Sequence, residues 1–151
     1  MAERLAPTNS GDERALAMRR IQHWTAEELL DPIEVRHSGR GTVRRFSRNA
    51  LLDAALLWEM SERNMSISRM RYARTIIAFE RTDREPDPFE VALRGERRVL
   101  ILINLESIQD RRPLVVLDPA EPIVPNDWPV GFWIDLTSAF ARLRPHLSEL
   151  K

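Results

Sequence analysis

A basic turn that leads directly into an amphipathic helix, residues 36–58, constrains the fold more than any other part of the sequence. Gly39 and Gly41 permit a tight turn, because glycine adopts backbone conformations that other residues avoid. Residues 42–46 alternate apolar and basic side chains, as an exposed strand does. Ser47 is a good helix N-cap, so the sequence predicts a strand that passes directly into a helix.

The first half of this stretch, residues 36–48, concentrates positive charge. It contains five arginines and no acidic residue, and the arginines are Arg36, Arg40, Arg44, Arg45 and Arg48. A small arginine-rich hairpin fixed to a helix suits the binding of phosphate, since a guanidinium donates paired hydrogen bonds to oxyanions. The alternative is a solvated basic turn, which composition alone favours.

Composition narrows the class of protein. The 151 residues suffice for one domain, or for two small ones that share a core. The 23 basic and 23 acidic residues balance, so the overall charge does not indicate nucleic acid. The absence of cysteine excludes disulfides, thiolate metal sites and a cysteine nucleophile. No apolar run approaches a membrane span and the start is not a signal peptide, so we expect a cytoplasmic, nucleoid-associated protein without membrane contact.

Helical periodicity surrounds a hairpin predicted at residues 33–46. The predicted helices are 12–30, 47–63 and 66–81. Asp12 is the expected cap of the first helix, and a capping signal after Trp24 also allows a break there. Asn64 tolerates a left-handed conformation in the turn before the last of these helices.

The helical pattern stops after the third predicted helix. Pro86, Pro88 and several charged residues follow and indicate a boundary. We therefore expect domains over residues 1–82 and 89–151, joined by a linker over 83–88. Segments 89–93 and 98–105 flank a turn and predict a hairpin. The remaining predicted elements are a short strand at 114–117, a loop at 119–129, a strand at 131–134 and a helix from Asp135 or Thr137 to about His146. The fold class is therefore α+β.

The order helix, turn, helix, basic hairpin and two helices is that of a winged helix-turn-helix domain. Three segments in this order carry a more specific resemblance: residues 20–30, 41–47 and 65–68. They resemble the DNA-binding domain of the MerR family. Its pattern is a leucine-arginine-aromatic segment ending in glycine-leucine-leucine, an arginine-x-aromatic wing, and a glycine-x-serine-leucine turn. The resemblance covers roughly residues 5–80, and the rest would be a small β-sheet and a C-terminal helix.

The chain departs from the family pattern at identifiable places. Glu28 stands where the pattern has glycine, and Gln22 with His23 replaces the arginine-aromatic pair. No sensor cysteines are present, and prolines interrupt the region after residue 82 where the family has a long dimerisation helix. The family's metal-sensing chemistry is therefore not expected here.

The resemblance implies positions for DNA-binding residues. It places four side chains on the helix that enters the major groove: Arg19, Arg20, Gln22 and His23. Arginine pairs there with guanine and glutamine with adenine; the alternative is an exposed polar face. Arg44 matches the wing arginine that contacts phosphate, and its expected neighbours in this role are Arg40, Arg45 and Arg48. Phe46 matches the wing aromatic, and we expect it in the core with Trp24 and Trp58.

Other chemistry has less support. The three histidines are far apart and lack carboxylates at metal-ligand spacing, and neither a phosphate-binding glycine loop nor a nucleophile elbow occurs. We therefore predict no catalytic residue, metal or cofactor. The aromatic group Trp128, Phe132 and Trp133 suits a core or a dimer contact better than a pocket.

The leading hypothesis is a sequence-specific transcriptional regulator that binds double-stranded DNA as a homodimer on a roughly palindromic site. The resemblance implies that it distorts promoter DNA. Residues 89–151 would dimerise, or bind an effector or a protein partner. The second hypothesis is a protein-interaction module with a degenerate winged helix that acts through its C-terminal half. A small enzyme that uses that half is third, supported only by the aromatic group.

Overall fold

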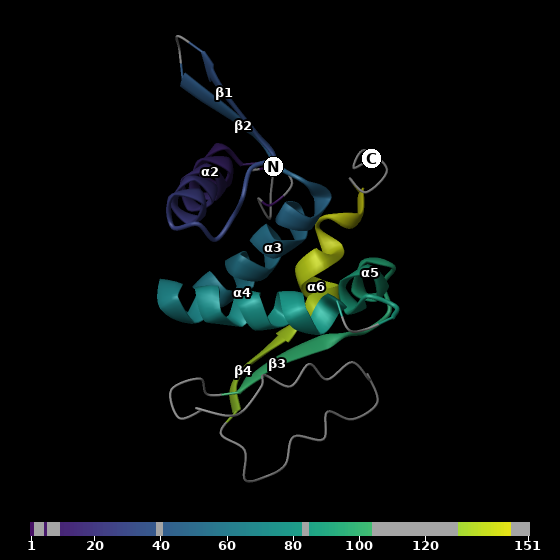
Figure 1. The fold of residues 1–151 in the computed structure, drawn as a ribbon. Coiled ribbons are helices and arrows are strands. Elements are labelled where there is room, and N and C mark those ends of the chain that lie inside the picture. The colour runs from purple at the N-terminus through teal and green to yellow at the C-terminus, as the bar shows by residue number, and fades with distance from the viewer. Residues whose placement is uncertain (2–4, 6–9, 39–40, 83–84, 104–129, 146–151) are drawn as a thin grey trace.

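The computed structural model describes residues 1, 5, 10–38, 41–82, 85–103 and 130–145. Over this part of the chain the fold is α+β, with five helices and two separate two-stranded antiparallel sheets. The elements are α2 (Gly11–Ala26), β1 (Glu34–Ser38), β2 (Gly41–Arg45), α3 (Arg48–Glu62), α4 (Ile67–Thr82), α5 (Pro88–Leu93), β3 (Val99–Ile103), β4 (Val130–Asp135) and α6 (Leu136–Ala141). The β1–β2 hairpin projects from one end of the molecule, the β3–β4 sheet lies at the other, and the helices lie between them (Figure 1).

The first long helix begins earlier and ends earlier than predicted. Ser10, and not Asp12, is the N-cap of α2, because its hydroxyl accepts a hydrogen bond from the backbone N–H of Glu13 at 3.3 Å. The helix ends at Ala26. Glu28 then has a φ of 58°, and the chain reverses with the backbone N–H of Leu29 bonded to the carbonyl of Trp24 at 2.8 Å. No new helix begins after Trp24, because the Thr25 hydroxyl donates back to the carbonyl of Ile21 at 2.8 Å and the residues after Ala26 form turns.

The hairpin and the two following helices confirm the sequence prediction. β1 pairs with β2 in antiparallel register, and the backbone N–H of Ile33 extends the ladder to the carbonyl of Arg45 at 2.9 Å. The Ser47 hydroxyl caps α3 by accepting from the backbone N–H of Ala50 at 3.0 Å. Asn64 has a φ of 56° in the turn before α4. The hairpin is thus joined to α3 without a free linker.

The prediction of a strand at residues 89–93 was wrong, because this segment is the helix α5. Asp87 caps it by accepting from the backbone N–H of Phe89 at 2.9 Å, and Pro88 occupies the first helical position, which needs no N–H donor. Phe89, Val91, Ala92 and Leu93 are all buried. Glu90 is the one polar residue of this segment, and five residues are too few to separate a helical period from that of a strand.

The predicted partner of the next strand was therefore also wrong. β3 pairs antiparallel with β4, and the register joins Val99 to Asp135. Asp135 caps α6 as predicted, with its carboxylate accepting from the backbone N–H of Ser138 at 3.1 Å. The helix ends at Ala141, before the predicted end at His146. The strand predicted at 114–117 and the loop at 119–129 lie outside the described residues.

One buried apolar cluster includes side chains from both halves of the chain. Trp24 and Trp58 pack edge to face with ring centroids 6.5 Å apart, which confirms both as core residues. Phe89 and Phe140 pack in the same manner at 5.1 Å and belong to the same cluster. Phe46 is partly buried against it. The segments before and after residues 83–88 thus contribute to a single core.

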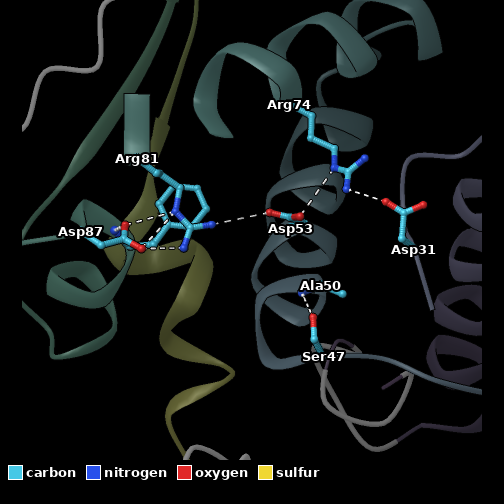
Figure 2. A network of polar contacts seen from close by, with 8 residues as sticks. Asp31, Ser47, Ala50, Asp53, Arg74, Arg81 and Asp87 are labelled. Carbon is cyan, nitrogen blue, oxygen red and sulfur yellow. Dashed lines mark hydrogen bonds and ion pairs between the residues drawn. The ribbon is translucent and has the colours of Figure 1, made fainter. Parts of the chain in front are cut away.

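A row of ion pairs, which we call the ionic chain, also joins the two halves (Figure 2). Arg74 of α4 donates to Asp31 at 3.0 Å, and its Nε lies 3.6 Å from Asp53 of α3. Arg81, two turns further along α4, lies 3.9 Å from Asp53 and donates three hydrogen bonds to Asp87, the shortest 2.6 Å. The ionic chain therefore runs from the segment after α2 to the cap of α5.

Candidate nucleic-acid interface

The outer face of α2 displays most of the residues predicted to read bases. Ala17, Ile21 and Trp24 are buried on the inner face, and this spacing directs the side chains of Arg19, Gln22 and His23 to solvent. All of the latter three are exposed. Arg19 contacts no carboxylate among the described residues, so its charge is available to an outside ligand.

Arg20 lies differently from its neighbours. Its guanidinium stacks 4.2 Å from the centre of the Trp58 ring, and its Nη1 donates to Glu62 at 2.6 Å. The Arg20 side chain is only 23% exposed. It therefore braces α2 against α3, and its charge has a partner inside the protein.

The hairpin has two different faces, because residues opposite one another in an antiparallel pair point to the same side. On one face Glu34 accepts from Arg36 at 2.5 Å and from Arg45 at 3.2 Å. Glu34 lies two residues before the basic turn, which itself contains no acidic residue. Strand pairing nevertheless places Glu34 opposite Arg45 of that turn. This face carries two guanidiniums and one carboxylate, and both guanidiniums remain more than 60% exposed (72% and 67%).

The other face of the hairpin carries Arg44 beside exposed apolar and polar groups. The register sets Val35 opposite Arg44 and His37 opposite Thr42, whose hydroxyl lies 3.4 Å from the His37 Nδ1. Arg44 is exposed and has no carboxylate partner in the part of the chain that the structure describes. This face therefore has an unneutralised cation.

The last two predicted wing residues have different outcomes. Arg48 is the first residue of α3, and both of its Nη atoms donate to the two carboxylate oxygens of Glu90, one of them at 2.9 Å. The hydrogen bond to Glu90 raises the pKa of Arg48, against partial burial that lowers it. Arg48 thus links α3 to α5. Arg40 lies outside the described residues.

Sequence reasoning missed the acidic partners and the ionic chain. Glu62 and Glu90 are each 42 residues from the arginine that they bind, so no local pattern connects them. Asp53 gave a weak signal, because a lone carboxylate interrupts an otherwise apolar segment of the predicted helix at residues 50–58.

Comparisons with protein-family models, with curated proteins and with solved structures found no match to this chain. None of the described helices has both the length and the apolar character needed to cross a membrane. The described residues also bring together no group of three or more histidine, cysteine or acidic side chains that could hold a metal ion.

Proposed function

We propose that this protein is a sequence-specific DNA-binding regulator of transcription, of the winged helix-turn-helix type that the MerR-like sequence pattern implies. In this proposal α2 enters the major groove, and Arg19, Gln22 and His23 contact base edges. The β1–β2 hairpin is the wing, and Arg44 contacts a backbone phosphate. The regulator binds as a homodimer to a roughly palindromic site.

One observation carries the proposal. A hairpin with exposed arginines projects beyond the helical body close to α2 (Figure 1), and α2 exposes Arg19, Gln22 and His23. Two exposed basic elements that flank one end of a rigid body can engage a groove and the adjacent phosphates together. Glu28 adds support, since it holds the left-handed conformation at the position where the family pattern has glycine.

The first test is fluorescence anisotropy of the full chain with randomised duplex DNA, with a salt titration and sequencing of the bound fraction. We expect salt-dependent binding and an enriched palindrome. No binding at low salt would refute the proposal. A bound fraction without sequence enrichment would leave only a nonspecific DNA-binding protein.

Charge variants of the hairpin give a signed test of the wing. Arg44→Ala should reduce the slope of log K against log salt by about 0.9, which is the loss of one phosphate contact. Glu34→Gln should strengthen binding, because it releases Arg36 and Arg45 from their carboxylate partner. The control is Arg97→Ala, an exposed arginine two residues before β3, a strand that does not belong to the β1–β2 hairpin. Equal effects of Arg44→Ala and Arg97→Ala would remove the wing from the mechanism.

A second candidate function is a protein-interaction module that acts through the C-terminal half. The observation that favours it is Trp133 of β4, whose side chain is 57% exposed although tryptophan is costly to leave in water. The sequence predicted either a core role or a dimer contact for the aromatic group. Because Trp133 is exposed, it is not a core residue, and for this residue the contact with another chain stays a prediction. Failure of DNA binding in the first test would make this candidate the leading one.

A further inference from the structure

A hollow of about 560 Å³ opens between α3 and α4 near the start of α5. Asn49 and Asp53 line it from α3, one turn apart, and Thr75 and Ala78 line it from α4. Arg74 and Arg81 of the ionic chain border it on either side of Asp53 (Figure 2). The hollow lies on the joint between the two halves, since its lining comes from α3, from α4 and from Asp87, the cap of α5.

The two arginines direct their hydrogen bonds away from Asp53. Arg81 donates through Nε and Nη2 to Asp87, and Arg74 donates through Nη2 to Asp31. Their nearest nitrogens lie 3.9 Å and 3.6 Å from the Asp53 carboxylate, which exceeds the usual length of a charged hydrogen bond. Asp53 therefore keeps capacity to accept hydrogen bonds from a group in the hollow.

Asp53 has the longest ion-pair contacts among the charged residues of the hollow. Two carboxylates and two guanidiniums line it, Asp53, Asp87, Arg74 and Arg81, and they balance in number. The hydrogen bonds of the two arginines go to Asp87 and Asp31, so Asp53 has only the longer ion-pair contacts, and its side chain is only 21% exposed. Burial raises the pKa of Asp53, and attraction to Arg74 and Arg81 offsets only part of this effect. A cation in the hollow would replace the hydration that the carboxylate has lost.

The other polar groups of the hollow also suit a donor. The side-chain amide oxygen of Asn49 and the hydroxyl oxygen of Thr75 can each accept a hydrogen bond; Thr75 donates its own proton to the carbonyl of Arg71 at 3.0 Å. A primary ammonium group has three donors and no acceptor, which matches three oxygens from different side chains. The methyl group of Ala78 leaves room for an apolar stem.

We propose that this hollow binds the primary ammonium group of a small alkylamine, with Asp53 as its counter-ion and Asn49 and Thr75 as further acceptors. The site does not depend on the DNA-binding proposal, because none of its residues belongs to the candidate interface.

Titration of the full-length protein followed by amide NMR signals tests the site. The probe is n-butylamine hydrochloride at pH 7, with sodium chloride held at equal ionic strength, and the neutral control is n-butanol. We expect saturable shifts of the amide signals of residues 49–53 and 74–78 with butylammonium, and no saturable shift there with butanol. The same response to both probes, or no saturable response to butylammonium, overturns the proposal.

Variants then identify the counter-ion. Asp53→Asn keeps the shape of the side chain and should weaken the affinity for butylammonium about tenfold or more, as expected for a charged hydrogen bond. The matched control is Asp12→Asn, which removes the same charge from the exposed first turn of α2 and should change the affinity less than about twofold. Equal affinity of Asp53→Asn and the wild type excludes Asp53 as counter-ion and overturns the proposal.

A second variant keeps the test valid if Asp53→Asn does not fold. Ala78→Leu places a larger side chain in the hollow at an exposed helical position, where leucine is well tolerated. We expect it to fold and to lose the saturable response to butylammonium. Retained binding in a folded Ala78→Leu variant places the ammonium outside the hollow and overturns the proposal.

Discussion

Replacement of Asp87 by alanine should destabilise the protein more than the loss of a helix cap alone. The Asp87 carboxylate has two functions, since it caps α5 by accepting from the backbone N–H of Phe89 and it accepts three hydrogen bonds from Arg81. The Arg81 side chain is only 15% exposed, and its guanidinium lies 4.1 Å from the centre of the Phe89 ring. The variant would leave this largely buried cation without its main partner.

The size of the effect follows from the two functions. Loss of an N-cap costs about 1 kcal/mol. Loss of charged hydrogen bonds to a mostly buried group costs about 1.5–3 kcal/mol. Asp53, 3.9 Å from Arg81, can take up part of the charge in the variant, which favours the lower end of that range. We therefore expect Asp87→Ala to reduce the free energy of unfolding by about 2.5 kcal/mol.

Two further variants separate the contributions. Asp135→Ala removes the corresponding cap of α6 and should cost about 1 kcal/mol. Asp87→Asn retains a side chain that caps helices well but removes the charge, so it should fall between the two alanine variants. The assay is urea denaturation followed by circular dichroism, with equal m-values required for comparison. Equal losses for Asp87→Ala and Asp135→Ala would show that the contact with Arg81 adds no stability.

Two other predictions concern single residues. Glu28→Gly should raise the free energy of unfolding by about 0.5–1 kcal/mol, because a φ of 58° strains a residue with a Cβ atom. Asn64→Gly, at a φ of 56°, should gain less, since asparagine tolerates this conformation; equal gains in urea denaturation would refute the argument. For Asp53, a folded-state pKa above its ordinary value of 3.8 means that the folded state binds a proton more tightly than the unfolded chain. The ionised group therefore opposes folding above that pKa, and protonation removes the penalty. The stability of Asp53→Asn relative to the wild type should thus be greater at pH 7 than at pH 4. If Asp53→Asn instead became more stable relative to the wild type as the pH falls from 7 to 4, the arginines would have to lower the pKa of Asp53 below its ordinary value.

Local signals explain which parts of the fold the sequence predicts. Ser47 contacts a backbone group three residues away, and Asn64 requires only its own conformation, so both are visible in a short window. Segment 89–93 was misassigned because its cap residue, Asp87, lies in a stretch of prolines and charges that also suits a linker. The pairing of β3 with β4 depends on residues about thirty positions apart, which no periodicity reveals.

The candidate interface shows the same limit. The spacing of Ala17, Ile21 and Trp24 fixes the exposed face of α2, and so the placement of Arg19 follows from the sequence. Arg20 is the next residue, but its side chain contacts Trp58 and Glu62 of α3, and the sequence near Arg20 does not reveal these contacts. A count of arginines therefore overstates the charge available to a ligand.

The candidate interface cannot be separated from the C-terminal half. Arg142, which follows α6, donates to the carbonyl of Leu5 at 3.1 Å and to Glu59 at 3.0 Å, and its guanidinium lies 5.8 Å from the centre of the Trp58 ring. Arg20 of α2 stacks on that same ring. A chain cut at residue 82 would lose this contact together with Phe89 and Phe140, and would expose the core surface that they cover. Weak DNA binding by such a fragment would reflect loss of folding, so the proposed function can be judged only on the whole chain.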